Sequence, residues 1–330
     1  MPGVDAPARA YPWTALWVLV LAGVLAMALA VAVGSVPLGA ADLWAVFTGG
    51  GNELQRDLIW SLRAPRALAA FATGGLLALA GALMQVLLRN PLADPYVLGL
   101  SGGAAVGALG AMLLGAGAVL VSGSAFAGAL LSTLLVFGLA RGGGSWTPTR
   151  LLLTGVVVAA GWSAVISFLL TMSPAERLPG MLYWLMGDLS HAGAPGWAWL
   201  VLVVAVAAML PLGRPLNVLA RGPLQAAALG VAVRPLETSV YVLASLVTAV
   251  AVTTAGSVGF VGLIVPHLLR LVLGNDQRLI LPASALAGGI LLTLADTLAR
   301  ILLAPQQLPV GVITALLGVP VFLFLLYRSR

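Results

Sequence analysis

Long apolar runs alternate with short polar segments along almost the whole chain. A helix needs about 17–25 apolar residues to cross roughly 30 Å of hydrocarbon. Ten runs are close to that length, at residues 13–33, 67–88, 96–114, 118–140, 151–171, 195–213, 238–257, 259–274, 279–303 and 310–327. Very short turns separate the third from the fourth and the seventh from the eighth, so a count lower by one or two also fits. The pattern predicts an all-α integral membrane protein with about ten transmembrane helices.

The polar segments between these runs are short. The longest, at about 34–66, 172–194 and 214–237, have room for only a helix or two each. We therefore expect a single transmembrane domain over residues 1–330, with short surface helices at 174–185 and around 216–230. The first run follows Arg9 as a signal peptide would, but it is longer than the usual 7–15-residue core and many spans follow, so we interpret it as a retained helix.

Composition supports a lipid environment and excludes several classes of site. Hydrophobic residues make up 61% of the chain and charged residues 8%, against about 45–50% and about 25% in soluble domains. There is no cysteine, which excludes disulfides and thiolate chemistry. Every basic residue other than histidine is arginine, so the lysine of a P-loop is missing and ATP, if used, is bound by another subunit. The arginines are also too dispersed for a nucleic-acid surface.

The arginines indicate an orientation. With ten spans and a cytoplasmic N-terminus, the five on outer segments are Arg56, Arg63, Arg66, Arg177 and Arg300, and the other eleven are cytoplasmic. The positive-inside rule favours this arrangement and places both termini in the cytoplasm.

The stretch RNPLADPYVLGLSGG, at 89–103, interrupts this apolar pattern. Its two prolines end a helix and bias the residues before them toward extended backbone. Irregular backbone at membrane depth is tolerated where protein buries it or water reaches it. The stretch therefore suggests the lining of a water-accessible cavity, and an ordinary cytoplasmic loop is the alternative.

Small residues and one serine in this region have competing interpretations. Gly99, Gly103 and Gly107, like the pair Ala255 and Gly259, have the spacing of close helix packing. Gly99 to Gly102 also matches the Gly-x-Ser-Gly of intramembrane proteases, with His267 as a base for Ser101. Because His267 follows Pro266 near a predicted cytoplasmic helix end, packing or capping is the better interpretation and no catalytic residue is expected.

Longer blocks of sequence resemble the FecCD family, the permease subunits of bacterial type II ABC importers for haem, iron-siderophores and vitamin B12. The resemblance covers nearly the full length, in the family's order and spacing. The blocks are LRAPRALAAFATGGLLALAGALMQ, RNPLADPYVLGLSGGAAVGA, YWLMGDLS, PLNVLARGPLQAAALGV, GSVGFVGLIVPHLLRLVLG, ADTLAR and LPVGVITALLGVPVFLFLL.

The resemblance implies a homodimer in the bacterial inner membrane, in contact with membrane lipid. Two cytoplasmic ABC ATPase subunits would bind ATP and Mg, and a periplasmic substrate-binding protein would deliver the cargo. The permease itself would carry no cofactor or metal and would translocate by alternating access.

The resemblance also implies site residues. Asn90, Leu92 and Thr149 match the cytoplasmic gate, and Arg63, Arg66 and Arg300 match positions that dock the binding protein. The ATPase-coupling segment 216–231 contains Leu216, Asn217, Arg221, Gly222, Gln225 and Gly230. The sequence departs from the family at Pro148, Pro223 and Gln307, where a small polar residue, a Glu and a Glu are usual.

The cargo is left open by the residues. An iron complex is the expectation, because iron is the commoner cargo in the family. Haem is slightly favoured over a ferric siderophore, although no residue supports that preference. Cobalamin is the alternative, and a secondary transporter is a much weaker one.

Overall fold

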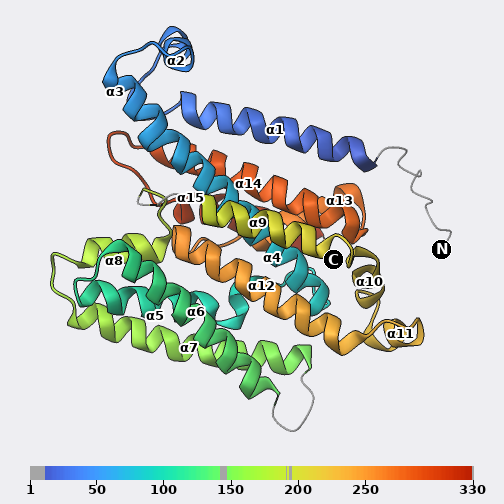
Figure 1. Ribbon diagram of the computed structural model, residues 1–330. Helices are drawn as coiled ribbons and strands as arrows, with labels where there is room; N and C mark the ends of the chain where they lie inside the picture. Colours follow the sequence, from blue (N-terminus) through green and yellow to red (C-terminus); the bar gives the residue numbers. More distant parts are fainter. Residues whose placement is uncertain (1–11, 142–146, 191, 193–194, 329–330) are drawn as a thin grey trace.

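The computed structural model describes residues 12–141, 147–190, 192 and 195–328, and all regular elements in these ranges are helical (Figure 1). In chain order the elements are α1 (Pro12–Ala32), α2 (Ala40–Phe47), α3 (Glu53–Arg56), η1 (Asp57–Arg63), α4 (Ala64–Leu87), η2 (Pro95–Leu98), α5 (Leu100–Leu113), α6 (Ala118–Ala140), α7 (Pro148–Met172), α8 (Leu178–Met186), α9 (Gly196–Met209), α10 (Gly213–Leu219), α11 (Pro223–Ala228), α12 (Val233–Ala255), α13 (Val261–Leu273), α14 (Gln277–Ile301) and α15 (Val310–Arg328).

Each of the ten predicted apolar runs contains a helix, but not each is a full span. Six helices in the described chain are long and apolar enough to cross a membrane, or seven if α9 and α10, which meet at a 70° bend, form one broken span. The apolar helices of α5, α13 and α15 are shorter. By length and composition, six or seven of the ten predicted helices are therefore full spans, and the other three are shorter apolar helices.

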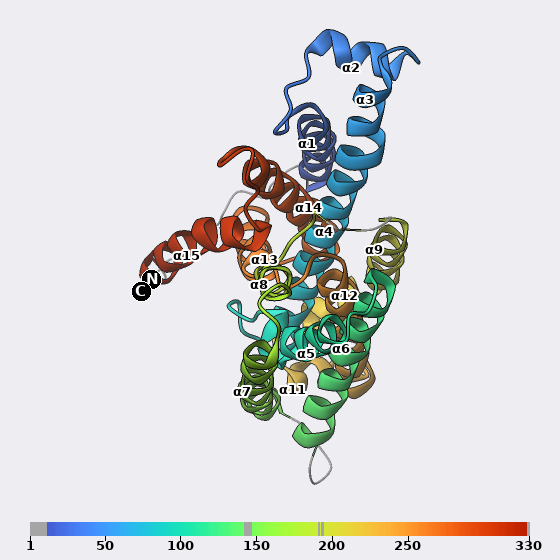
Figure 2. The same cartoon turned by 90° about the vertical axis from the view of Figure 1, so that its left-hand side faces the viewer.

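The long helix α4 forms the centre of the molecule. It continues α3 and η1 into one 35-residue helix, and 94% of that helix's most apolar stretch is buried. Small residues permit this burial: a Cβ on Gly74 would meet the carbonyl of Gly288 in α14, and one on Gly81 would meet that of Gly262 in α13. Figure 2 shows the other helices arranged around α4.

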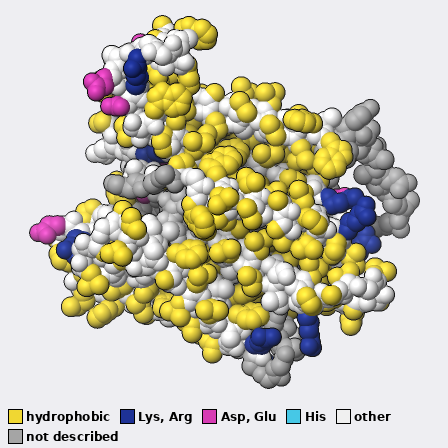
Figure 3. All heavy atoms as spheres, in the orientation of Figure 1, with side chains coloured by type: hydrophobic (Ala, Val, Ile, Leu, Met, Phe, Trp, Pro, Cys, Tyr) yellow, Lys and Arg dark blue, Asp and Glu magenta, His cyan; other side chains and the backbone are white. Residues whose placement is uncertain are grey.

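One face of the molecule shows an apolar band between two polar ends. Hydrophobic side chains cover the broad middle of the face in Figure 3, and charged side chains gather toward its ends. Helices α2, α3 and α8 lie at one end, whereas α10 and α11 lie at the other (Figure 1). The predicted surface helices at 174–185 and around 216–230 correspond to α8 and to α10 with α11.

Candidate functional site

The irregular connection between α4 and α5 is held by local hydrogen bonds. Asn90 Oδ1 accepts from the backbone N–H of Leu92 at 2.9 Å, and Asp94 Oδ1 accepts from that of Tyr96 at 2.8 Å. Such side-chain bonds to the backbone stabilise turns rather than helix. Gly99 then adopts the left-handed region, with φ of 71°, and allows the chain to enter α5.

Neighbouring helices fix this connection in place. Ser132 of α6 donates its hydroxyl to the carbonyl of Gly99 at 2.8 Å and accepts from the indole N–H of Trp162 in α7 at 2.9 Å. The hydroxyl of Tyr96 accepts from the backbone N–H of Val258, in the break between α12 and α13, at 3.2 Å. The two irregular segments of the membrane region therefore support each other, as expected for non-helical backbone that protein surrounds.

The predicted gate residues lie at the ends of two elements. Asn90 and Leu92 are half-buried in the connection, and Thr149 is exposed in the first turn of α7. Thr147 caps that helix by accepting from the backbone N–H of Arg150, and Pro148 occupies a first-turn position, where proline is favoured. No hydrogen bond within the described ranges joins Thr149 to Asn90 or Leu92, so their gating role stays a prediction.

A row of hydroxyls on α7 was not singled out from the sequence. Ser163, Ser167 and Thr171 are exposed, follow one another at four-residue intervals and donate to the carbonyls four residues earlier at 2.8 to 3.0 Å. Thr149 precedes Ser167 by 18 residues, or five helical turns, and therefore lies on the same face. Of the six long helices, α7 has the smallest buried share, 11%. The sequence feature that could have identified this row is the four-residue spacing of hydroxyl side chains within an apolar run.

The predicted docking arginines form a cluster at the end of α4. Arg66 donates to both carboxylate oxygens of Asp296 at 2.8 to 3.1 Å, and to Gln307 Oε1 at 2.6 Å. Arg300 lies 3.2 Å from the same carboxylate. Arg63 donates to the carbonyls of the residues that end α1, at 2.9 and 3.1 Å.

The three predicted docking arginines are mostly buried. Arg63, Arg66 and Arg300 are 6%, 11% and 5% exposed, because each guanidinium joins helices of the same chain. All three line a cavity of about 230 Å³, which gives a partner's side chain a route to them. The docking role itself stays a prediction. Asp296, 1% exposed, lies at the centre of the cluster and pairs with both Arg66 and Arg300.

The predicted coupling residues occupy α10, α11 and their connections. Leu216 is buried, whereas Arg221 and Gln225 are exposed. Asn217 donates to Asp276 Oδ1 at 2.8 Å and accepts from the backbone N–H of Gln277 at 2.7 Å, which attaches α10 to the start of α14.

Backbone geometry explains the two glycines and the proline of this segment. Gly222 and Gly230 have φ of 128° and 79°, a region that favours glycine. Pro223 takes the first position of α11, so the departure from the family at this residue is compatible with the helix. Sequence analysis missed the side chains of Leu224 and Leu229, which are 86% and 71% exposed.

The pair of Ser101 and His267 does not form a catalytic arrangement. His267 hydrogen-bonds the backbone of Pro91, in the irregular connection, and no hydrogen bond in the described chain joins it to Ser101. Its packing interpretation is therefore preferred over the protease one.

Known proteins match this chain over most of its length. The FecCD transport family matches residues 19–328. A cobalamin import system permease protein, BtuC, from Halobacterium salinarum is 44% identical over 85% of this chain and 76% of its own. A vitamin B12 import system permease protein BtuC from Escherichia coli O127:H6 is 38% identical over 95% of both chains.

A solved structure shares the fold. An ABC transporter of metal-chelate type, in an inward-facing conformation, superposes with a TM-score of 0.84 at 30% identity, over 97% of this chain and all of that one. The architecture is therefore that of a type II ABC importer permease. The chain belongs to the FecCD transport family and is a membrane-embedded permease of the ABC importer class.

Proposed function

We propose that this chain is the permease subunit of an ATP-driven importer of cobalamin. The observation that carries the proposal is its similarity, over 85% and 95% of the chain, to cobalamin and vitamin B12 permeases. The expectation from the sequence ranked an iron complex first; these relatives favour the alternative.

The hydroxyl row on α7 supports a path for a large, weakly held cargo. Ser163, Ser167 and Thr171 offer neutral groups whose hydrogen-bonding capacity is partly used within the helix. The amides at the edge of a corrin ring can exchange weak hydrogen bonds with such hydroxyls without being trapped. Strong sites along the path would slow release, since a bound state must also be left.

The proposed importer also requires partner subunits. A homodimer would place the exposed face of α7 along the path between subunits, in the bacterial inner membrane with both termini cytoplasmic. Two ATPase subunits, with ATP and Mg, would contact α10 and α11. The exposed side chains of Leu224 and Leu229 suit such an interface, because large apolar groups on a polar surface favour burial against a partner. A substrate-binding protein would dock at the opposite end, near the arginine cluster.

Uptake into proteoliposomes tests the proposal. The permease, its ATPase and its binding protein would be reconstituted, and ATP-dependent entry of cobalamin, haem and a ferric siderophore would be compared. Selective entry of cobalamin is expected. Selective entry of another cargo would contradict the assignment of cobalamin while preserving the importer, whereas entry without the ATPase would contradict the importer itself.

An iron complex is the second candidate. The similarity to a transporter of metal-chelate type favours it, and the same uptake comparison separates the two cargos.

A further inference from the structure

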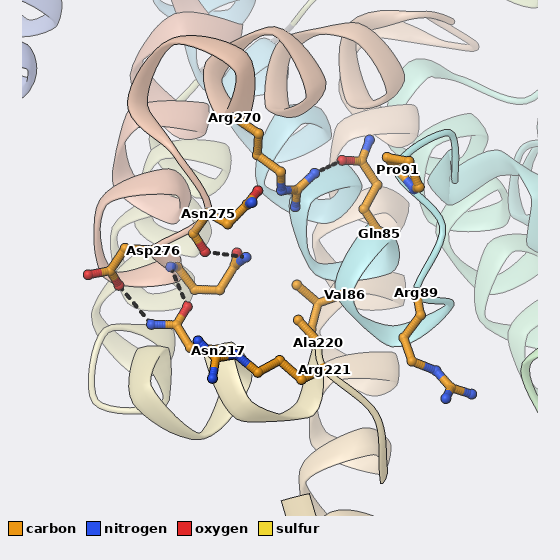
Figure 4. A pocket seen from close by; sticks show the side chains of 11 residues that line it. Gln85, Val86, Arg89, Pro91, Asn217, Ala220, Arg221, Arg270, Asn275 and Asp276 are labelled. Atoms are coloured by element: carbon orange, nitrogen blue, oxygen red, sulfur yellow. Dashed lines mark hydrogen bonds between the residues drawn. The ribbon is translucent and has the colours of Figure 1, made fainter. Parts of the chain in front are cut away.

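A cavity of about 570 Å³, lined mostly by polar and charged residue types, lies beside the predicted coupling helices (Figure 4). Its walls come from the end of α4, the connection that follows it, α10, the end of α13 and the segment that leads into α14. Among the described residues that line it, the apolar ones are Val86, Pro91 and Ala220. We refer to this cavity as the α10 recess.

Two arginines bring positive charge to the α10 recess. Arg270 and Arg221 lie on opposite sides of it in Figure 4, whereas the side chain of Arg89 points away. Arg270 donates to Gln85 Oε1 and to the carbonyl of Ala82, both uncharged acceptors. Arg221 takes part in none of the ion pairs that the structure describes, such as those of Arg66, Arg278 and Arg300.

The lining offers little negative charge in return. Asp276 is its one carboxylate, and it is paired with Arg278 at 2.6 Å while it also accepts from Asn217 at 2.8 Å. The hydrogen bonds from Arg278 and Asn217, together with the charge of Arg278, lower the pKa of Asp276 to about 2, so it is ionised and already neutralised at physiological pH. The recess therefore has an excess of positive charge and attracts an anionic group.

A buried, unpaired acceptor is a second feature of the recess. The side chain of Gln277 is 2% exposed and lines the cavity, and its Oε1 has no hydrogen-bond partner in the described structure. Its amide nitrogen donates to the carbonyl of Asn275 at 3.3 Å. A buried acceptor without a partner costs about 1–3 kcal/mol, and an occupant that brings a donor recovers this cost.

We propose that the α10 recess receives an acidic side chain of the ATPase subunit, together with a neighbouring N–H or O–H donor of the same segment. The proposal rests on the proposed function and specifies what the ATPase brings to α10. The carboxylate pairs with Arg221 and Arg270, and the donor reaches Gln277 Oε1. The recess lies beside α10, where the proposed function places the ATPase, and this position favours a side chain of that subunit as the occupant.

Salt-dependent binding of the ATPase tests the charge pairing. The affinity of the cognate ATPase for the permease homodimer in nanodiscs would be measured at several ionic strengths for wild type, Arg221→Gln and Arg270→Gln. Arg234→Gln is the control, because Arg234 is exposed at the start of α12 and does not line the recess. At low salt, both recess variants should bind the ATPase at least about tenfold more weakly than wild type does. Their affinity should also fall less than that of wild type as salt is added.

The possible results distinguish a failure of the recess proposal from a failure of the proposed function. If wild type and both recess variants bind with equal affinity and equal salt dependence, the recess proposal is overturned while the importer assignment stands. If wild type binds no ATPase, the proposed function fails. Arg221 is exposed, so its variant remains informative even if Arg270→Gln does not fold.

Cross-linking tests the identity of the occupant. The chain has no cysteine, so Asn275→Cys places a single thiol at the exposed edge of the recess. A photoreactive maleimide attached there should cross-link to a segment of the bound ATPase that contains Asp or Glu. A cross-linked segment without an acidic residue, or no cross-link in the assembled complex, would overturn the proposal.

Discussion

At the scale of single residues, the arginine cluster has more positive than negative charge. Arg66 and Arg300 share the carboxylate of Asp296, and Gln307 supplies a neutral acceptor to Arg66. Arg63 donates instead to backbone carbonyls at the end of α1. A reversal of Arg66 to Glu would place two carboxylates in contact within the fold. Lost docking in such a variant would therefore not distinguish a partner contact from structural damage, and gentler changes are needed.

Gln307→Glu should stabilise the cluster. Gln307 Oε1 accepts from Arg66 at 2.6 Å, and a charged acceptor makes such a bond about twice as strong. Gln307 is half-buried, so the cost of desolvating a carboxylate is moderate. We expect a gain of roughly 1 kcal/mol, seen as a higher melting temperature of the purified permease. Gln306→Glu, on the exposed neighbour, is the control; an equal effect of both would assign the gain to general charge.

Asp94 should make stability depend on pH. Burial raises the pKa of Asp94 to about 6, and the hydrogen bond from Tyr96 only partly offsets this effect. A raised pKa means that the folded state holds the proton more tightly than the unfolded one, so unfolding free energy falls as pH rises from about 4 to about 6. Asp94→Asn keeps the accepting oxygen but has no charge.

The Asp94→Asn variant should match wild type near pH 4 and melt at a higher temperature near pH 7.5. Thermal denaturation across this range, with Asp188→Asn as the control, measures the difference. Parallel pH profiles for wild type and Asp94→Asn would show that the folded structure does not penalise the ionised carboxylate.

At the scale of elements, small residues set the distance between α5 and α6. A Cβ on Gly107 would meet the carbonyl of Ser124, and one on Gly103 that of Gly128, so the packing predicted from their spacing is confirmed. Gly259 has open space around it, and its predicted packing with Ala255 is wrong, because the chain has left the helix there.

Gly107→Val should disrupt this packing. The obstructing atom is a backbone carbonyl, which cannot move without shifting α6, so we expect a loss of about 1–3 kcal/mol or more. Gly110→Val is the matched control, since it changes the same residue type in the same helix but meets nothing within 4 Å. Melting temperature and the yield of monodisperse permease report the difference; similar losses in both would point to helix propensity instead.

The sequence predicted elements better than contacts. Every apolar run became a helix, since hydropathy is a local property, and the prolines at 91 and 95 marked the irregular connection. The shortening of α5 and α13 was not predictable, because Tyr96 and Val258 stabilise irregular backbone across 162 positions of sequence. Burial of Arg63 and Arg300 likewise depends on α1 and α14 meeting α4, which no local pattern encodes.

At the scale of the whole molecule, the exposed face of α7 connects the predicted gate to the opposite end. Thr149, Ser163, Ser167 and Thr171 lie on that face, and so little of α7 is buried that a second subunit, lipid or water must cover it. The hydroxyls are bonded within the helix, which would also let them face lipid. Chemical access to the side chains separates these environments.

Ser167→Cys should react with a membrane-impermeant maleimide in the reconstituted complex, whereas Val165→Cys should not. Val165 is exposed in the single chain but lies two residues away, on nearly the opposite side of the helix. Thiols react as thiolates, which form in water and not in hydrocarbon. Because the chain has no cysteine, each variant carries one thiol.

If the permease works by alternating access, trapping the ATPase in one nucleotide state should also change the rate at which the Ser167→Cys thiol reacts with the maleimide. Equal labelling of both variants, or a rate that ignores the nucleotide state, would remove the α7 face from the path and leave its hydroxyls as lipid-facing groups.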